Sequence, residues 1–163
     1  MRSVAGVLRA FADTPQPDAG FSALMAAFFD DPGYRLATIL QHDPEAALCR
    51  RVWTNDPARY PIGGAKPVAD APWAQAALFE ARIFHAPDED AVRAAYADHA
   101  IIASLGCASA VNFPVRWNGT VIGTINLLHD ARHFVSVDLR SFETLVQLAT
   151  APLIAHGPLA TYG

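Results

Sequence analysis

Cys107 and His129 are the two residues whose types and spacing point most directly to chemistry. An imidazole next to a thiol favours the thiolate, which is the nucleophilic form of cysteine. Asn118-Gly119 is a strong signal for a two-residue type I′ hairpin turn, because both turn residues need a positive φ. With that turn, His129 lies opposite Ala108 and therefore next to Cys107. A buried cysteine is also a common small hydrophobic residue, so the pair predicts either a thiol nucleophile or a polar part of a binding pocket.

The same pairing assigns the polar residues of segment 108–129 to the two faces of the hairpin. Asn112 lies on the face that carries His129, where Gly123 leaves space for a ligand, whereas Asn126 lies on the other face. Large apolar side chains occur on both faces, so we expect both faces to be covered. A purely structural hairpin has no need of these polar side chains. We therefore expect Asn112 and His129 to line or support a ligand pocket, in preference to Asn126.

Segment 55–72 is a long connection with four prolines and two glycines. Compact domains seldom contain so long a loop unless it acts as a lid or a binding loop. It carries Tyr60 and Lys66, and Trp73 follows at a predicted helix start, where an aromatic ring can wall a cavity. Gly63-Gly64 with Lys66 has the character of an anion site, although the phosphate-loop pattern is absent. We expect a lid over a pocket that includes Tyr60, Lys66 and Trp73; the alternative is a stiff cover over the sheet.

Composition and charge argue against several classes of function. A net charge of −4 and a pI near 5.8 do not suit a nucleic-acid partner, and no apolar run reaches the roughly 18 residues of a membrane span. Two cysteines, Cys49 and Cys107, are too few for a disulfide framework, so we expect a cytoplasmic protein. The H-x-x-x-H spacing of His129 and His133 straddles a strand end and a turn, so no metal site is expected. The residues identify no cofactor.

Hydrophobic periodicity gives the order of the elements that must position these residues. The predicted strands cover 34–41, 47–54, 82–86 and the hairpin 108–129. The predicted helices cover 2–12, the segment from Phe21 to Phe29, short segments after Pro72 and after Asp88, 96–104, and a long helix from Ser136 with a kink near Pro152. This order indicates one α+β domain over 1–163. It comprises N-terminal helices (1–33), a sheet region with inserted helices and the lid loop (34–135), and a C-terminal helix (136–156).

Segment 110–128, AVNFPVRWNGTVIGTINLL, followed by His133-Phe134, Val137-Asp138 and a long helix, resembles the C-terminal half of a GAF domain. The family pattern there is a strand ending in Pro-Val, a glycine turn, Val-Ile-Gly-x-Ile-Asn-Leu, an aromatic residue, an aspartate and a long helix. The N-terminal half matches the family in its order of elements. The resemblance implies a central antiparallel sheet with helices from both termini on one face. It also implies a small-molecule pocket under short helices and loops on the other face, and homodimers through the terminal helices.

Three specialised groups of GAF-like proteins have motifs that this sequence does not reproduce. These motifs are the three-cysteine set of free methionine-(R)-sulfoxide reductases, the bilin-attachment motifs of phytochromes, and the Asn-Lys-Phe-Asp-Glu signature of cyclic-nucleotide-binding members. We therefore expect a non-catalytic sensory or regulatory domain that binds a small molecule and signals through dimerisation or a separate partner. The alternatives are a thiol-dependent enzyme, for example a small reductase that uses Cys107 with His129, and a protein-interaction module with a vestigial pocket.

Overall fold

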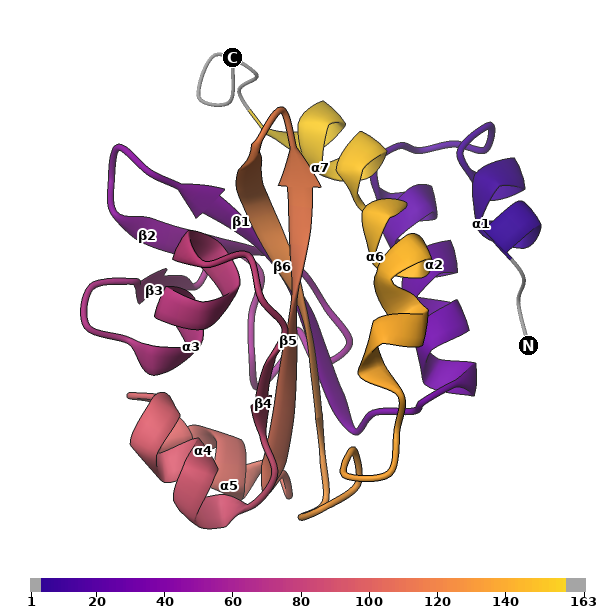
Figure 1. Ribbon diagram of the computed structural model, residues 1–163. Helices are drawn as coiled ribbons and strands as arrows, with labels where there is room; N and C mark the ends of the chain where they lie inside the picture. Colours follow the sequence, from indigo (N-terminus) through magenta and orange to yellow (C-terminus); the bar gives the residue numbers. More distant parts are fainter. Residues whose placement is uncertain (1–3, 158–163) are drawn as a thin grey trace.

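The computed structural model describes residues 4–157, and within them the strands form one antiparallel sheet of six strands in the order β3-β2-β1-β6-β5-β4 (Figure 1). Pairing of β1 with β6 joins the two halves of the chain at the centre of the sheet. With helices on both faces, this is the predicted α+β class. The strands are β1 (Leu36–Asp43), β2 (Leu48–Thr54), β3 (Ala65–Pro67), β4 (Phe84–Ala86), β5 (Ser109–Trp117) and β6 (Thr120–His129).

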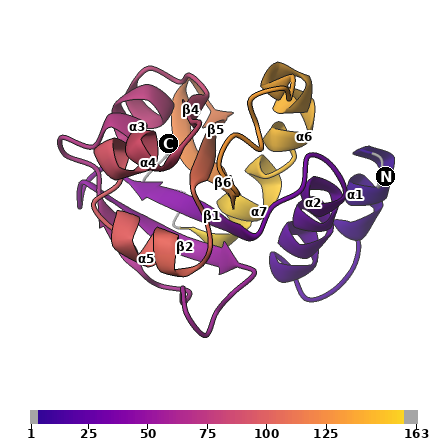
Figure 2. The same cartoon turned by 90° about the horizontal axis from the view of Figure 1, so that it is seen from below.

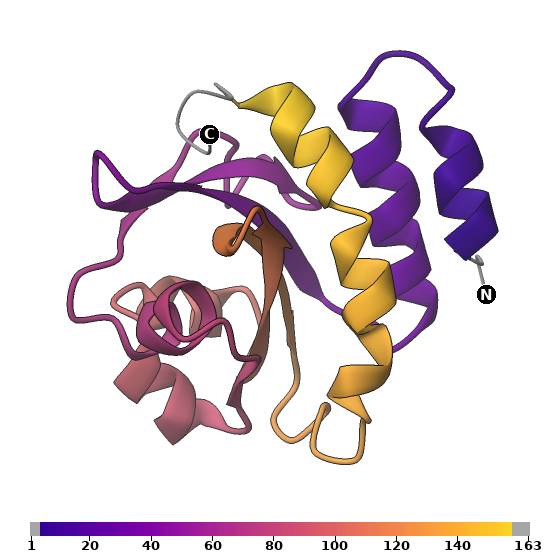
Figure 3. The same cartoon turned by 45° about the horizontal axis from the view of Figure 1, so that its top comes forward.

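Helices cover both faces of the sheet, and each face draws its helices from a different part of the chain (Figures 2 and 3). The first face carries the helices from the two ends of the chain: α1 (Val4–Ala10), α2 (Asp18–Asp30), a 3₁₀ turn η2 (Leu139–Phe142), α6 (Glu143–Gln147) and α7 (Thr150–His156). The second face carries the helices from its middle: α3 (Pro72–Ala74), a π-helical turn η1 (Gln75–Phe79), α4 (Glu89–Ala95) and α5 (His99–Ser104). The expected placement of the terminal helices on one face is confirmed.

Each face of the sheet has its own hydrophobic core. On the first face, the ring of Phe28 from α2 lies 5.9 Å from that of Phe113 in β5 and 5.8 Å from that of Phe142, measured between centroids. Burying each such ring contributes about 2–3 kcal/mol. The chain leaves α2 at Gly33, whose φ of +85° suits a residue without a side chain. The core of the second face surrounds the candidate site and includes Leu40, Trp73, Ile102, Cys107 and Leu128.

The C-terminal helix is predicted as one helix from Ser136, but the structure divides it. It begins as the 3₁₀ turn η2, and the helix is interrupted between α6 and α7 at Leu148 and Ala149. Pro152 has no N–H to donate to the carbonyl of Leu148 four residues earlier, and its ring crowds that turn. The kink expected near Pro152 is therefore confirmed, and it lies on the N-terminal side of the proline.

The turn of the β5–β6 hairpin is the predicted one, but the register of its strands is not. Asn118 and Gly119 have φ values of +49° and +76°, as a two-residue turn requires. After two pairs the register shifts by one residue, and Ile122 becomes the extra residue of a β-bulge. Gly123 follows it at a point where a Cβ atom would overlap the carbonyl oxygen of Leu40 in β1. The close approach of β6 to β1 therefore depends on a glycine at this position.

The bulge reverses the predicted distribution of polar side chains, because a one-residue shift moves every later side chain of a strand to the other face. Asn112 pairs with Asn126, and His129 pairs with Ser109 rather than lying opposite Ala108. The prediction that Asn112 shares a face with His129 is therefore wrong. Asn112 and Asn126 share the second face of the sheet, and His129 lies on the first face, with the terminal helices.

The predicted lid contains a short strand. Its residues 65–67 form β3, which adds to the edge of β2 and places Lys66 opposite Cys49. The N–H of Gly63 donates to the carbonyl of Arg51 at 2.8 Å, which holds the preceding turn against β2. The lid then leads into α3, which begins at Pro72 as predicted. Segment 55–72 is thus fixed along one edge of the sheet and lies over its second face; we call this segment the lid.

Candidate functional site

A small cavity lies between the second face of the sheet and the lid with α3–α5. Its volume is about 10 Å³, which is room for about one water molecule. Of the residues singled out from the sequence, the structure brings together Tyr60, Lys66, Trp73 and Asn112 around it, whereas Cys107 and His129 are not among its lining residues. The other lining residues are Thr38, Leu40, Tyr96, Ile102, Asn126 and Leu128.

A chain of hydrogen bonds crosses the floor of this cavity. The hydroxyl of Tyr96 donates to Oδ1 of Asn112, and Nδ2 of Asn112 donates to Oδ1 of Asn126. Nδ2 of Asn126 then donates to Oγ1 of Thr38 at 3.0 Å. The strand register produces this chain, because Asn126 of β6 pairs with Asn112 of β5 on one side and with Thr38 of β1 on the other. All four side chains are buried; we call them the polar chain.

An ion pair closes the cavity. Nζ of Lys66, on β3 within the lid, lies 2.9 Å from Oδ2 and 3.2 Å from Oδ1 of Asp98, which lies between α4 and α5. The hydroxyl of Tyr60 donates to the same carboxylate. The Lys66 and Asp98 side chains are only 17 % and 24 % exposed, so water screens their attraction weakly. The contact joins the lid to the short helices; we call it the lid ion pair.

Burial and the lid ion pair act in opposite directions on the pKa values of both partners. For Asp98, burial acts to raise the pKa, but Lys66 and the hydrogen bond from Tyr60 outweigh it and hold the pKa below its usual value. For Lys66, burial lowers the pKa, and Asp98 opposes that shift. Asp98 was missed in the sequence analysis because a single aspartate between two short helices has the pattern of an exposed surface residue.

Aromatic rings form the walls of the cavity. The Trp73 indole stacks on the Tyr96 ring, with centroids 6.4 Å apart and an angle of 15° between the planes. The guanidinium carbon of Arg51 lies 3.4 Å from the centroid of the Tyr60 ring, which is a cation–π geometry. Burial raises the pKa of both tyrosines above the ordinary value. Their hydroxyl groups therefore stay protonated at neutral pH and act as hydrogen-bond donors.

His129 lies away from the cavity, on the first face of the sheet. Its ring stacks on the ring of His133, with centroids 3.6 Å apart and an angle of 4°. Its Nδ1 accepts a hydrogen bond from the N–H of Asp130 at 2.8 Å. Burial lowers the pKa of His129, and the neighbouring His133 lowers it further. The bulge at Ile122 is the physical reason for this placement, as described above.

Cys107 belongs to the core of the second face and is only 3 % exposed. Its Sγ lies 3.9 Å from the carbonyl oxygen of Leu105, and burial raises the pKa of the thiol to about 11. Within residues 4–157, no hydrogen bond or ion pair joins Cys107 to His129. Burial also raises the pKa of Cys49, to about 12. Both thiols are therefore protonated at neutral pH, which is the unreactive form.

Among residues 4–157, no group of three or more His, Cys, Asp or Glu side chains is arranged to hold a metal ion. None of the helices between residues 4 and 157 has both the length and the apolar character needed to span a bilayer.

The sheet order, the terminal helices on one face and the lidded cavity on the other define a GAF-like α+β domain. The chain belongs to the GAF domain family, because the family's sequence profile matches residues 2–151. No curated protein sequence is significantly similar to it.

Solved structures share this fold at low sequence identity. The GAF domain of an Acinetobacter phosphoenolpyruvate-protein phosphotransferase is 12 % identical, with a TM-score of 0.70 over 92 % of this chain and 89 % of that one. The GAF domain of a two-component sensor histidine kinase from Bacillus halodurans is 11 % identical, with a TM-score of 0.68 over 95 % and 96 % of the two chains. A free methionine-R-sulfoxide reductase from Neisseria meningitidis is 17 % identical, with a TM-score of 0.68 over 93 % and 86 %.

Proposed function

We propose that this chain is a cytoplasmic regulatory domain that binds a small molecule in the lidded cavity without transforming it. The observation that supports this most is the polar chain. Buried amides and hydroxyls cost free energy unless they are paired, and an ordinary core at this position would consist of apolar side chains. Here Asn112 and Asn126 place a donor and an acceptor side by side within an apolar wall.

The ligand enters only when the lid moves, because the closed cavity has room for about one water molecule. Breaking the lid ion pair releases Lys66 and Asp98, and it also frees the hydroxyl of Tyr60. The opened cavity has amide groups on its floor and aromatic faces on its walls. This lining matches a compact planar molecule with adjacent donor and acceptor groups. The ligand thereby stabilises one arrangement of lid and sheet over the other.

The terminal helices are the proposed output. Val4 and Leu8 lie one turn apart on α1 and are 38 % and 50 % exposed, and Phe29 on α2 is 61 % exposed. Large exposed apolar side chains on helices suit a contact with a second copy of the chain, the commonest type of oligomer. The similar domain in a sensor histidine kinase supports a sensory role. Signalling then runs through a homodimer, or through a separate partner that binds the same helices.

Native mass spectrometry of freshly purified protein, followed by denaturing release, tests the proposed binding. A retained small-molecule mass that is lost on denaturation identifies the ligand class, and the same spectrum gives the oligomeric state. Hydrogen exchange with and without that ligand then tests the relay: protection is expected to change in the lid and in residues 1–30 or 136–156. A change confined to the lid would overturn the relay but not the binding.

A second candidate function is favoured by the small volume of the cavity. Side chains of the chain itself, above all Tyr60, Trp73 and Tyr96, already fill the space behind the lid. This is the arrangement expected of a protein-interaction module with a vestigial pocket. Purified protein without any retained mass, and with a lid that exchanges as slowly as the core strands, would favour this function over ligand binding.

A further inference from the structure

A second and much larger cleft lies on the opposite face of the sheet from the lidded cavity. It has a volume of about 670 Å³ and runs between the β4–β5 edge and the helical segment η2–α6. Half of its lining residues are apolar, among them Ile83, Phe113, Leu139 and Val146. Sites that bind small molecules have volumes of about 300–1,000 Å³ and mostly apolar linings. The size and lining of this cleft therefore suit a small-molecule ligand.

Positive charge is concentrated at the rim of this cleft, although the whole chain carries a net charge of −4. Arg82, Arg116 and Arg140 all line it, and Glu143 is the one carboxylate among its lining residues. Arg82 already forms an ion pair with Glu80, and Arg116 donates to the carbonyl of Ala81 at 3.1 Å, whereas within residues 4–157 no ion pair engages Arg140. A local excess of guanidinium groups beside apolar surface attracts anions.

His85 adds an unsatisfied polar atom to the lining. Within the described chain its Nε2 is buried and has no hydrogen-bond partner. Its position in β4 opposite Val111 directs it to the face of the terminal helices, where its ring meets the ring of Phe134 edge-on. Burial lowers the pKa of His85, so the imidazole is neutral at neutral pH and offers one donor or acceptor. Buried polar atoms are almost always paired in folded proteins, and a ligand that reaches this nitrogen after a small side-chain movement would supply the missing partner.

The backbone of Arg116 at this edge is already satisfied, which argues against a peptide strand that pairs with the end of β5 as the occupant. Gln147 of α6 accepts from the N–H of Arg116 at 2.9 Å and donates to its carbonyl at 2.9 Å. Pro114, the next outward-facing residue of β5, has no N–H to offer. A further strand would need these groups to extend the sheet. A small molecule needs none of them.

We propose that this cleft binds a small apolar molecule with one carboxylate group. The carboxylate lies at the rim against Arg140 and Arg82, and the apolar body packs on the half-buried side chains of Ile83 and Leu139. His85 makes a polar contact inside the cleft. This site is separate from the lidded cavity, because the two lie on opposite faces of the sheet.

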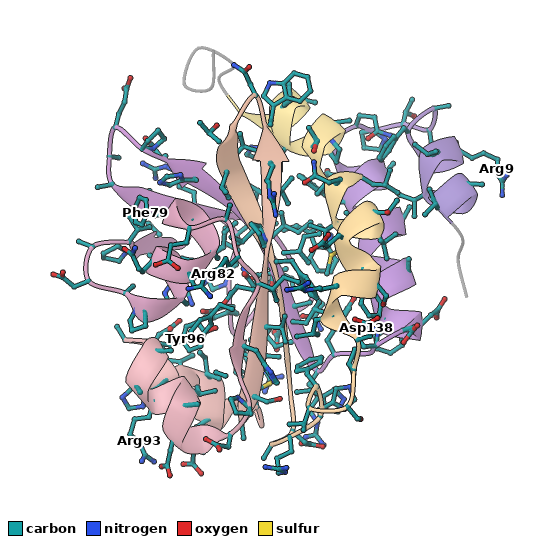
Figure 4. The ribbon with its side chains drawn as sticks, viewed as in Figure 1. Arg9, Phe79, Arg82, Arg93, Tyr96 and Asp138 are labelled. Carbon is teal, nitrogen blue, oxygen red and sulfur yellow. The ribbon has the colours of Figure 1, made fainter. Side chains whose placement is uncertain are left out.

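The test is an NMR titration of the ¹⁵N-labelled chain with 2-naphthoate, compared with the neutral 2-naphthamide. We expect saturable shifts in residues 81–85, 113–116 and 139–147, and an affinity about tenfold lower for the amide and for Arg140→Gln. Arg9→Gln is the matched control, because Arg9 projects outward from α1 far from the cleft (Figure 4). Shifts centred on the lidded cavity, absence of saturation, or equal affinity for acid and amide would overturn the proposal.

Two further variants test the contribution of charge to naphthoate binding. Arg82→Gln removes a second rim cation and is expected to weaken naphthoate binding several-fold. Glu143→Gln removes the carboxylate from the lining and is expected to strengthen it about two- to threefold. Both residues are exposed, and circular dichroism checks that each variant is folded. Unchanged affinity in both variants would show that the arginines do not recognise the ligand.

Discussion

Lys66 and Asp98, which are 32 residues apart in the sequence, form an ion pair at 2.9 Å that joins the lid to the turn between α4 and α5. Tyr60 donates to the same carboxylate, so three side chains from two segments close the cavity. Below them, the polar chain from Tyr96 to Thr38 forms the floor. In the proposed function, a ligand therefore reaches the polar floor only when the lid moves.

Removing the carboxylate of the lid ion pair should loosen the lid. We expect Asp98→Asn to lower the free energy of unfolding by about 1–3 kcal/mol, because it leaves the ammonium of Lys66 buried without a counter-charge. Hydrogen exchange of residues 60–68 should accelerate more than exchange elsewhere. Asp90→Asn is the matched control, since that side chain is 92 % exposed. Unaltered exchange in the lid of Asp98→Asn would contradict the role given to this ion pair.

The polar chain should behave as one unit in stability measurements. Asn126→Leu leaves Nδ2 of Asn112 without its acceptor, so we expect a loss of about 2–4 kcal/mol in urea unfolding. In the double variant Asn112→Leu/Asn126→Leu both amides are absent, and we expect a smaller loss than the sum of the two single variants. Additive losses would show that the two amides act independently. A stable double variant that retains no ligand would show that the amides are kept for binding.

The stacked rings of His129 and His133 should make stability depend on pH. The pKa of His129 is lower in the folded chain than in the unfolded chain, so the unfolded state binds the proton more readily. The contribution of His129 to the free energy of unfolding is therefore fully present above the unfolded pKa of about 6.5. It is lost as the pH drops through the folded pKa. His42 and His85 have lowered pKa values too and contribute in the same direction.

Urea unfolding at about pH 7 and about pH 5 measures this effect. We expect His129→Gln to lose less stability between the two pH values than the unaltered chain does. His99→Gln, a substitution on α5 away from the stacked rings, serves as the control. Equal losses in the His129 variant and the unaltered chain would mean that this histidine does not contribute to the pH dependence.

Local sequence signals predicted most of the fold. Asn118-Gly119 marked the hairpin turn, Pro152 marked the break in the last helix, and Asp88 caps α4 by accepting from the N–H of Ala91 at 3.0 Å. Each of these signals acts within a few residues of itself. The β-bulge at Ile122 depends instead on how β6 packs against β1 at Leu40, which lies far away in the sequence. The face of every residue beyond the bulge therefore could not be read from the hairpin alone.

In the candidate site, too, the residues with a local sequence signal could be predicted, whereas those that depend on contacts across the fold could not. Tyr60, Lys66 and Trp73 were selected from a long loop and the aromatic residue after it, and all three line the cavity. Asp98 had no such signal, because its importance comes from a contact made across the fold. Without the bulge, the pairing places His129 on the face of Asn112 and so favours it over Asn126 as a pocket residue. The bulge places Asn126 on that face instead. Whether any of these residues contacts a ligand stays a prediction.

Cys107 should react slowly with iodoacetamide near neutral pH. Its thiol is buried, and burial raises its pKa to about 11, so little thiolate is available. A third cysteine introduced by Ser104→Cys, on the exposed end of α5, provides an internal comparison, and we expect it to be modified at least tenfold faster than Cys107. Peptide mass spectrometry distinguishes the two sites. Faster modification of Cys107 than of the introduced cysteine would favour the thiol-dependent enzyme considered from the sequence.

The exposed apolar side chains of α1 should hold two copies of the chain together. If Leu8 is buried at the interface of a homodimer, Leu8→Lys places a charge in an apolar contact, and we expect the dissociation constant to rise at least about tenfold. Ile62→Lys, which replaces a similarly exposed apolar residue in the lid, should leave dimerisation unchanged. Sedimentation equilibrium over a range of concentrations measures both. An unaltered chain that stays monomeric at high concentration, or equal effects of the two variants, would remove α1 as the dimer contact and leave a separate partner as the route of signalling.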